Sequence, residues 1–224
     1  MGALLVSVLP LAIGAAISPT LLALQLLVLT GATKPRARAW ALAAGSALVL
    51  AAYAALGLTV LNHLHPAKHG QHSVHDAVIM FIAAGLLALL AVRSFVRRPT
   101  SVERHKTRTS GRLATAPTSW YVGVGALGMV VNFSTLLLFL PALHEITRSS
   151  ADLVARGLAF ALLFVITLLP VLVPVGLVTI LGERADPALE ATHAFVNRHA
   201  RQIGIVIEGA FALYLVWKGF GELP

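Results

Sequence analysis

Six long apolar stretches alternate with polar segments, at residues 4–29, 39–61, 77–92, 120–143, 154–181 and 203–217. A hydrocarbon core about 30 Å thick needs roughly 20 apolar residues of helix, and four of the stretches reach that length. The other two are shorter, but Arg93, Arg201 and Lys218 at their ends can reach the membrane surface. The first stretch is too long for the apolar core of a signal peptide. The pattern therefore predicts an all-α integral membrane protein with six transmembrane helices.

The first stretch contains a predicted helix break. Pro19 lacks a backbone donor and clashes with the preceding turn, while Ser18 and Thr20 place hydroxyls beside the carbonyls left free. Broken membrane helices are tolerated where protein or a water-lined cavity meets the freed groups, and transport sites lie at such breaks. A plain proline kink is the alternative, because proline is common in membrane helices.

A weak internal repeat links this break to the fourth stretch. Both segments read Gly-x-x-x-polar-x-hydroxyl, at an offset of 114 residues: Gly14, Ser18 and Thr20, then Gly128, Asn132 and Ser134. Duplicated units of three helices enter the membrane in opposite directions, so the pattern predicts a 3+3 inverted repeat with its site at the centre. Residues 1–96 and 119–224 would form the halves, joined by a basic cytoplasmic linker at 97–118. Chance resemblance is the alternative, since Gly-x-x-x-small patterns recur in packed membrane helices.

The fifth stretch carries Pro170 and Pro174, four residues apart and therefore on one helical face. Two successive turns lose an amide donor, which predicts a hinge. The freed carbonyls need partners, and the other polar side chains in the stretches are few: Gln25, Asn132, Ser134, Thr135, Thr167 and Thr179. These residues either line a substrate site or only hold helices together, because interhelical polar contacts are commonly worth about 0.6 kcal/mol.

Glu208 lies inside the sixth stretch, with no charged residue within six positions on either side. An ionised carboxylate is expensive in a membrane, so Glu208 is a candidate proton carrier, cation ligand or partner for a substrate hydroxyl. The alternative is a protonated side chain that only packs against a neighbouring helix. We expect a functional Glu208 to face the Ser18–Pro19 break.

Lysine and arginine are unevenly distributed between the loops. Three lie in the first loop, seven in the third and three in the fifth, against four on the other side. Basic residues accumulate on the cytoplasmic side, so we expect a multi-pass protein of the bacterial plasma (inner) membrane with both termini outside. The net charge of +8 is then a topology signal that suits anionic lipid and gives no reason to expect nucleic acid. The excess of Arg over Lys is typical of a GC-rich genome, such as that of an actinobacterium.

The second loop is rich in histidine and contains His63, His65, His69, His72 and His75. Clustered imidazoles can bind Zn, Ni, Co or Cu, although this spacing matches no structural or catalytic zinc site. The loop is therefore a weak metal candidate, and the alternative is a pH-sensitive or adventitious site. The chain has no cysteine, which excludes disulfides and thiolate metal sites, and no cofactor is predicted.

Short motifs along the whole chain resemble those of a known family. They are AISP in the first stretch, RAxA after the first basic turn, the basic central loop and LLPVLVPVG in the fifth stretch. Together they resemble the LysE superfamily of small six-helix exporters, and within it the GAP group, the peptidoglycolipid- or sulfolipid-addressing proteins of mycobacteria and relatives. The resemblance implies an inverted repeat, export of cell-envelope glycolipid and an MmpL-type transporter as partner.

The resemblance also assigns positions in this sequence. The family's broken-helix elements fall on Ser18 and Pro19 and on Pro170 and Pro174. Phe133 stands where the counterpart of Pro19 would map, so two equal breaks are not expected.

No catalytic constellation stands out, since no nucleophile elbow or metal pair is present, and we predict no enzyme activity. Three functions remain open: an exporter or export-accessory protein for cell-envelope lipid or glycolipid, with proton coupling as an option; a small-solute or metal-cation exporter of the same superfamily; or a membrane-embedded lipid-modifying enzyme. A lateral apolar opening would favour lipid, a closed polar cavity around Glu208 a small solute, and a wet cluster of ionisable residues an enzyme. The oligomeric state stays open.

Overall fold

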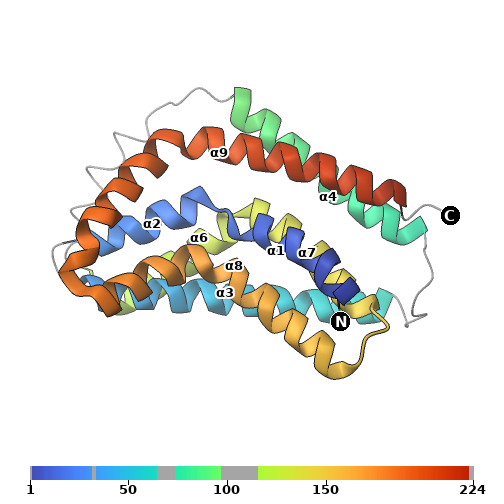
Figure 1. Ribbon diagram of the computed structural model, residues 1–224, viewed down its shortest axis with the longest axis horizontal. Coiled ribbons are helices and arrows are strands. Elements are labelled where there is room, and N and C mark those ends of the chain that lie inside the picture. The colour runs from blue at the N-terminus through green and yellow to red at the C-terminus, as the bar shows by residue number, and fades with distance from the viewer. Residues whose placement is uncertain (1, 32–33, 65–73, 97–115, 222–224) are drawn as a thin grey trace.

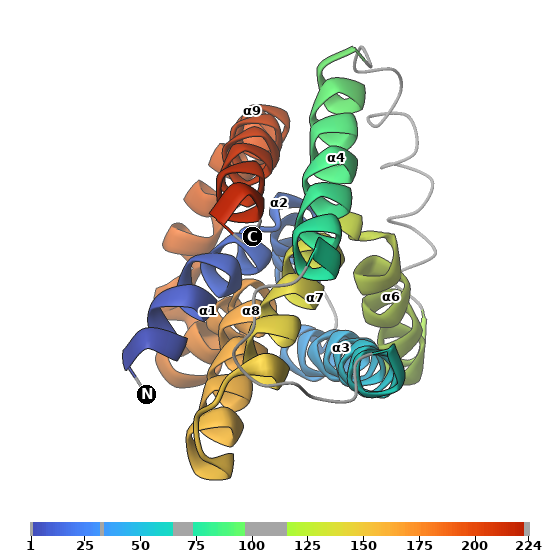
Figure 2. The same ribbon diagram turned by 90° about the vertical axis from the view of Figure 1, so that its right-hand side faces the viewer.

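The computed structural model describes residues 2–31, 34–64, 74–96 and 116–221, and all regular elements in these ranges are helical (Figure 1). The first half contains α1 (Gly2–Ala16), α2 (Pro19–Leu29), α3 (Pro35–Leu64) and α4 (Val74–Val96). The second half contains α6 (Thr118–Val131), α7 (Phe133–Arg148), α8 (Leu153–Leu181), the 3-10 turn η1 (Gly182–Ala185) and α9 (Asp186–Gly221). The first and last described helices, α1 and α9, bring the N- and C-termini to the same end of the molecule (Figures 1 and 2).

All six apolar stretches form helices, and by length and composition the structure supports three to five of the six predicted membrane spans. Pro35–Thr59, Leu153–Leu181 and Arg198–Gly221 are long and apolar enough to cross a membrane unaided. The α1–α2 and α6–α7 pairs pass the same test when each counts as one bent span. The apolar part of α4, Met80–Phe95, is shorter than the other spans. The all-α membrane class is confirmed, and the sixth span stays a prediction.

Helix α9 is much longer than the apolar stretch at 203–217, because it begins at Asp186. The additional turns are amphipathic: Leu189 and Val196 are buried, whereas Glu190 and Phe195 are exposed. These turns pack against α2 and curve around one end of the bundle (Figure 1). The segment expected to be a loop is therefore a structural wall, joined to α8 only by the short turn η1.

Helix packing in one half has a counterpart in the other. The contact of α8 with α1 corresponds to that of α3 with α6, and the contact of α2 with α9 corresponds to that of α7 with α4. Two further pairs, α3 with α8 and α4 with α9, join equivalent elements of the two halves. In the second of these pairs Phe81 stacks edge-on against Phe220 and Ser94 contacts Glu208, so α4 and α9 run antiparallel.

Two basic residues near the ends of predicted spans, Arg38 and Lys218, make contacts within the bundle. Arg38 is 8% exposed; its guanidinium donates to the Ala116 carbonyl at 2.9 Å and lies 5.1 Å from the centre of the Tyr121 ring. Lys218 lies 3.2 Å from the Glu145 carboxylate, which ties the end of α9 to α7. Such pairing removes the cost of an unpaired charge close to lipid.

The α3–α6 contact is a close approach of two backbones and depends on glycine. A Cβ atom at Gly45 would overlap the Val122 carbonyl, and one at Gly125 would overlap the Leu42 carbonyl. The Ser46 hydroxyl donates to the Gly125 carbonyl at 3.2 Å across the same contact. Small residues allow this spacing, which is a common way to pack membrane helices.

We expect Gly125→Ala to destabilise the protein by about 1–3 kcal/mol, because the methyl group must displace a backbone carbonyl. Thermal unfolding of the purified protein in detergent measures the change. Gly123→Ala is the matched control, since nothing lies within 4 Å of a Cβ there. Equal melting temperatures for the two variants would show that α3 and α6 are not in backbone contact.

Candidate functional site

The predicted break in the first stretch is present between α1 and α2, whose axes differ in direction by 51°. Ser18 has an extended backbone (φ −121°, ψ 93°), and its Oγ accepts a hydrogen bond from the Leu21 amide at 3.3 Å. Pro19 is the first residue of α2, where a missing amide proton is tolerated. The Ser18–Pro19 pair therefore ends one helix and caps the next, which is more than a kink.

A second break separates α6 from α7, at Asn132, and bends the chain by 72°. It occurs without a proline and is sharper than the first, although Phe133 occupies the position equivalent to Pro19. Asn132 has φ −83° and ψ 71°, outside the helical region. Both positions linked by the 114-residue offset are thus helix breaks.

The two breaks are in direct contact. The Asn132 amide donates to Ser18 Oγ at 2.8 Å and to Thr135 Oγ1 at 2.6 Å, and its carbonyl accepts from the Ser134 hydroxyl at 3.0 Å. Ser18, Asn132 and Thr135 are all buried. Every polar group of the Asn132 side chain therefore has a partner, and the network carries no formal charge.

The network also repairs the backbone that Pro19 interrupts. In a continuous helix the Ala15 carbonyl would accept from the amide of residue 19, which proline lacks. The Thr135 hydroxyl donates to this carbonyl at 2.9 Å instead. An unpaired carbonyl is expensive in a membrane, so the second broken helix stabilises the first. We call this set of residues, Ala15, Ser18, Asn132, Ser134 and Thr135, the crossing.

An apolar cavity of about 540 Å³ lies beside the crossing, between α2, α8 and the amphipathic part of α9. We call it the break cavity. Ser18 and Pro19 border it on one side and Pro170 and Pro174 on another, so the structure brings both predicted proline elements to one cavity. The full lining is Ala16, Ile17, Ser18, Pro19, Leu22, Leu26, Leu169, Pro170, Val173, Pro174, Leu177, Leu189, Thr192, Phe195, Val196 and Ile203. Helix α8 continues through both prolines without interruption.

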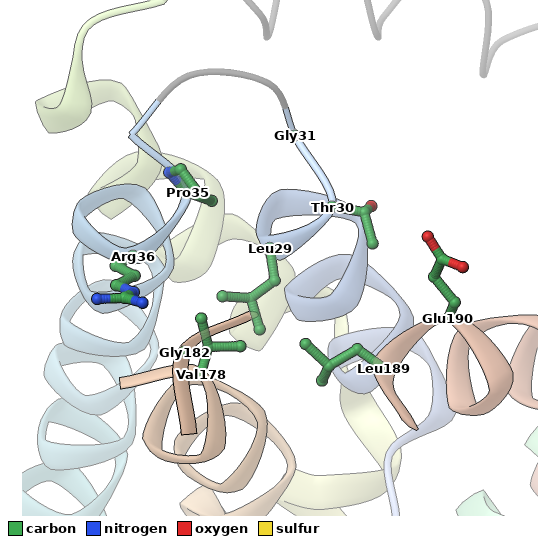
Figure 3. Close-up of a pocket in the computed structure, with 9 residues that line it drawn as sticks. All are labelled: Leu29, Thr30, Gly31, Pro35, Arg36, Val178, Gly182, Leu189 and Glu190. Atoms are coloured by element: carbon green, nitrogen blue, oxygen red, sulfur yellow. The ribbon is translucent and has the colours of Figure 1, made fainter. Parts of the chain in front are cut away.

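A second pocket, of about 380 Å³, lies at the C-terminal ends of α2 and α8 (Figure 3). We call it the mouth pocket. Figure 3 shows Arg36 on the α3 side and Glu190 on the α9 side, with Leu29 and Leu189 between them. Both charged side chains are exposed. The pocket therefore combines an apolar floor with a charged rim.

The other predicted polar residues do not line the break cavity. Gln25 is fully buried and donates to the Ala39 carbonyl at 3.3 Å, which fastens α2 to α3; its Oε1 has no partner. Thr20 is exposed. Thr167 and Thr179 bond to carbonyls of their own helix, at Leu163 and Val175. For these positions the structural alternative of helix-to-helix or local bonding describes what is seen.

Glu208 lies in the joint between α4 and α9, away from the break cavity. Its carboxylate accepts from the Ser94 hydroxyl at 3.5 Å. One face of the same joint is fixed by Arg201, which donates to the Ser94 carbonyl at 2.9 Å and to the Phe95 carbonyl at the end of α4. The structure does not bring Glu208 together with Ser18, although Phe211, one turn further along α9, covers Gly14 of α1.

The histidine-rich loop falls largely outside the described residues. His65, His69 and His72 lie outside the described residues. His63 and His75 lie in described helices, but their side chains are not described. Residues 97–115 of the predicted basic linker at 97–118 are likewise outside the described ranges. Within 2–31, 34–64, 74–96 and 116–221, no three His, Cys, Asp or Glu side chains are placed to hold a metal ion.

The sequence interpretation missed the third wall of the break cavity, which Leu189, Thr192 and Val196 of α9 provide. Their spacing of three and four residues is the signal of one helical face. This spacing can be read from the sequence. However, the polar residues between these three positions lower the mean hydropathy of the segment below that of a membrane span.

The fold and the crossing define a polytopic helical membrane protein in which two broken helices support each other beside an apolar cavity. The chain belongs to the sulfolipid-1-addressing protein family, because the family model described as Sap, sulfolipid-1-addressing protein, matches residues 8–221. The match extends from α1 to the end of α9 and supports the resemblance to the GAP group. Searches of curated proteins and of solved structures found no match.

The direct bond across the crossing predicts that Ser18 and Asn132 are energetically coupled. A double-mutant cycle with Ser18→Ala and Asn132→Ala, followed by thermal unfolding in detergent, should give a coupling of about 0.6–1.7 kcal/mol. Thr59→Val is the control partner for Ser18→Ala, since the Thr59 hydroxyl bonds only to Ala55 of its own helix. Strict additivity of Ser18→Ala and Asn132→Ala would rule out the contact.

Proposed function

We propose that this protein is an exporter, or an export-accessory protein, for lipid or glycolipid of the cell envelope, and that the break cavity receives the lipid chain. The apolar break cavity beside the crossing carries the proposal. Its volume lies within the range of about 300–1,000 Å³ common for ligand sites. The family's description supports a role in lipid addressing.

The break cavity opens toward the surface that faces lipid. Among its lining residues, Ile17, Val173 and Phe195 are 39%, 48% and 58% exposed. A hydrocarbon chain can therefore enter between the α1–α2 break, α8 and α9 without crossing a polar surface. A small polar solute would find only Ser18 and Thr192 as hydrogen-bonding side chains in this cavity, because Glu208 is not part of it. Lipid is the cargo class that this surface favours over a small solute or a cation.

An inverted 3+3 repeat of the LysE type accounts for the matched packing of the two halves. The two breaks are 114 residues apart in sequence and are bonded to each other, as expected for equivalent elements that meet at a two-fold axis within the membrane plane. Ser94 and Glu208 are separated by the same offset and are also in contact. In this arrangement α4 and α9 are the third helices of the halves, and α4 spans the membrane despite its short apolar part.

We place the protein in the bacterial plasma membrane with both termini outside and the linker 97–118 in the cytoplasm. The charge distribution of the loops supports this orientation, and the termini lie at one end of the bundle. An MmpL-type transporter is the partner that the resemblance implies. Proton coupling through Glu208 stays a prediction. Because Glu208 contacts Ser94 of α4, its protonation would act first on the α4–α9 contact and only indirectly on the crossing.

The proposed orientation can be tested by labelling, because the chain has no cysteine of its own. A single cysteine introduced by Lys106→Cys should be protected from a membrane-impermeant maleimide in intact cells and react after the cells are opened. Rapid labelling in intact cells would reverse the topology. A cysteine at Ser150, between α7 and α8, should show the opposite pattern.

Deletion of the gene should reduce a lipid or glycolipid at the cell surface while its total synthesis continues, as measured by lipidomics of surface extracts and whole cells. Val173→Trp should fail to restore export, because the indole fills the break cavity. Val165→Trp should restore it, since Val165 is on the same helix and 52% exposed but does not line the cavity. Unchanged surface lipids in the deletion strain would refute the proposed function.

A further inference from the structure

The break cavity and the mouth pocket adjoin each other. Leu189 of α9 lines both of them. On α8 the wall passes from Leu177 in the break cavity to Val178 in the mouth pocket, and on α2 it passes from Leu26 to Leu29, less than one turn further along. The two pockets together therefore lead from the crossing to the end of the bundle where the mouth pocket lies.

The two parts differ in chemistry along that direction. The break cavity is apolar, whereas the mouth pocket has Arg36 and Glu190 on its rim. The basic turn before α3 adds Lys34 on the Arg36 side, and the segment 31–38 contains no acidic residue. The α3 side of the described pocket lining is therefore cationic, and Glu190 is the acidic residue of that lining, on the opposite side (Figure 3).

We propose that the two pockets form a single site for an anionic amphiphile. Its hydrocarbon chain lies in the break cavity against Pro19, Pro170 and Pro174, and its sulfate or phosphate headgroup contacts Arg36 at the mouth. Arg36 suits this role because a guanidinium presents several donors in a fork that matches sulfate and phosphate oxygens. The assignment rests on the proposed lipid function and adds to it the charge of the headgroup and the direction in which the lipid lies.

This orientation has a mechanical consequence. The headgroup stays at the wet end of the bundle, where its charge needs no burial, and only the chain reaches the middle of the membrane. The chain then contacts the break of the first half and both prolines of α8, the elements whose backbone is least constrained by helical hydrogen bonds. A bound chain is placed to bias any rearrangement of α8 against α2.

Photolabelling of the full-length protein in nanodiscs of zwitterionic lipid tests the site directly. The probes are decyl chains with a terminal diazirine and a sulfate, a phosphate or a trimethylammonium headgroup. With the sulfate and phosphate probes, cross-links should map to α2 and α8 around residues 17–26 and 169–177. Arg36→Gln should weaken these two probes by about threefold to fivefold, the loss expected for one exposed charge contact, and should leave the ammonium probe unchanged.

Matched variants separate the two parts of the site. Lys34→Gln removes a neighbouring charge that does not line the mouth pocket and should have a smaller effect than Arg36→Gln. Arg36→Lys keeps the charge and should retain most of the affinity, which guards against a loss caused by misfolding. Val173→Trp should weaken all three probes, whereas Val165→Trp should weaken none.

Three results would overturn the site: cross-links outside both pockets, equal loss of anionic and cationic probes in Arg36→Gln, or tighter binding of the ammonium probe, which would assign the mouth to Glu190. Equal affinity for the sulfate and phosphate probes supports a site for anionic headgroups in general. A preference for one probe identifies the headgroup that the site binds. Failure here, with a lipid export defect still present in the deletion strain, would remove this site and leave the proposed function. Binding of the probes as expected, without an export defect in the deletion strain, would keep this site and remove the proposed function.

Discussion

The structure depends on how the backbone is satisfied where two helices are broken inside a membrane. Pro19 leaves the Ala15 carbonyl without its helical partner, and lipid offers none. The Thr135 hydroxyl supplies the missing donor from the other broken helix, and Asn132 holds Ser18 and Thr135 at once. Neither break is self-sufficient, since the polar groups of one are satisfied by the other. This mutual dependence fixes α1–α2 against α6–α7, and α8 and α9 pack against these broken helices.

The two sides of the crossing are built differently although their helices correspond. On one side α3 and α6 meet backbone to backbone at Gly45 and Gly125, which leaves no space for a ligand. On the other side α8 presents Pro170 and Pro174 to a cavity. Close contact between glycines resists sliding, whereas prolines reduce the number of backbone bonds that oppose bending. The fold thus combines one pair of helices in close backbone contact with a proline-containing helix that borders a cavity.

Much of this arrangement could be predicted from local sequence. The Ser18–Pro19 pair predicted its break because a missing donor stands beside a hydroxyl that can cap the next helix, whereas Pro170 and Pro174 stay inside a continuous helix. The 114-residue offset pointed to Asn132 although Phe133 replaces the proline. Glu208 shows the limit of such reasoning. Its position in an apolar helix was evident, but the face it presents depends on how α9 crosses α4, which is a property of the packed bundle. The cavity wall on α9 was missed for a related reason, because half of that helix is polar and lies outside any apolar stretch.

The crossing has one further property, which concerns the electric field across the membrane. Moving one elementary charge through a potential of 100 mV involves about 2.3 kcal/mol, more than most interhelical hydrogen bonds contribute. The crossing consists of an amide, three hydroxyls and a carbonyl, with no formal charge. A rearrangement confined to these groups carries no gating charge. The membrane voltage therefore exerts almost no force on these groups, and any rearrangement of the crossing would depend on the lipid and on the packing around it.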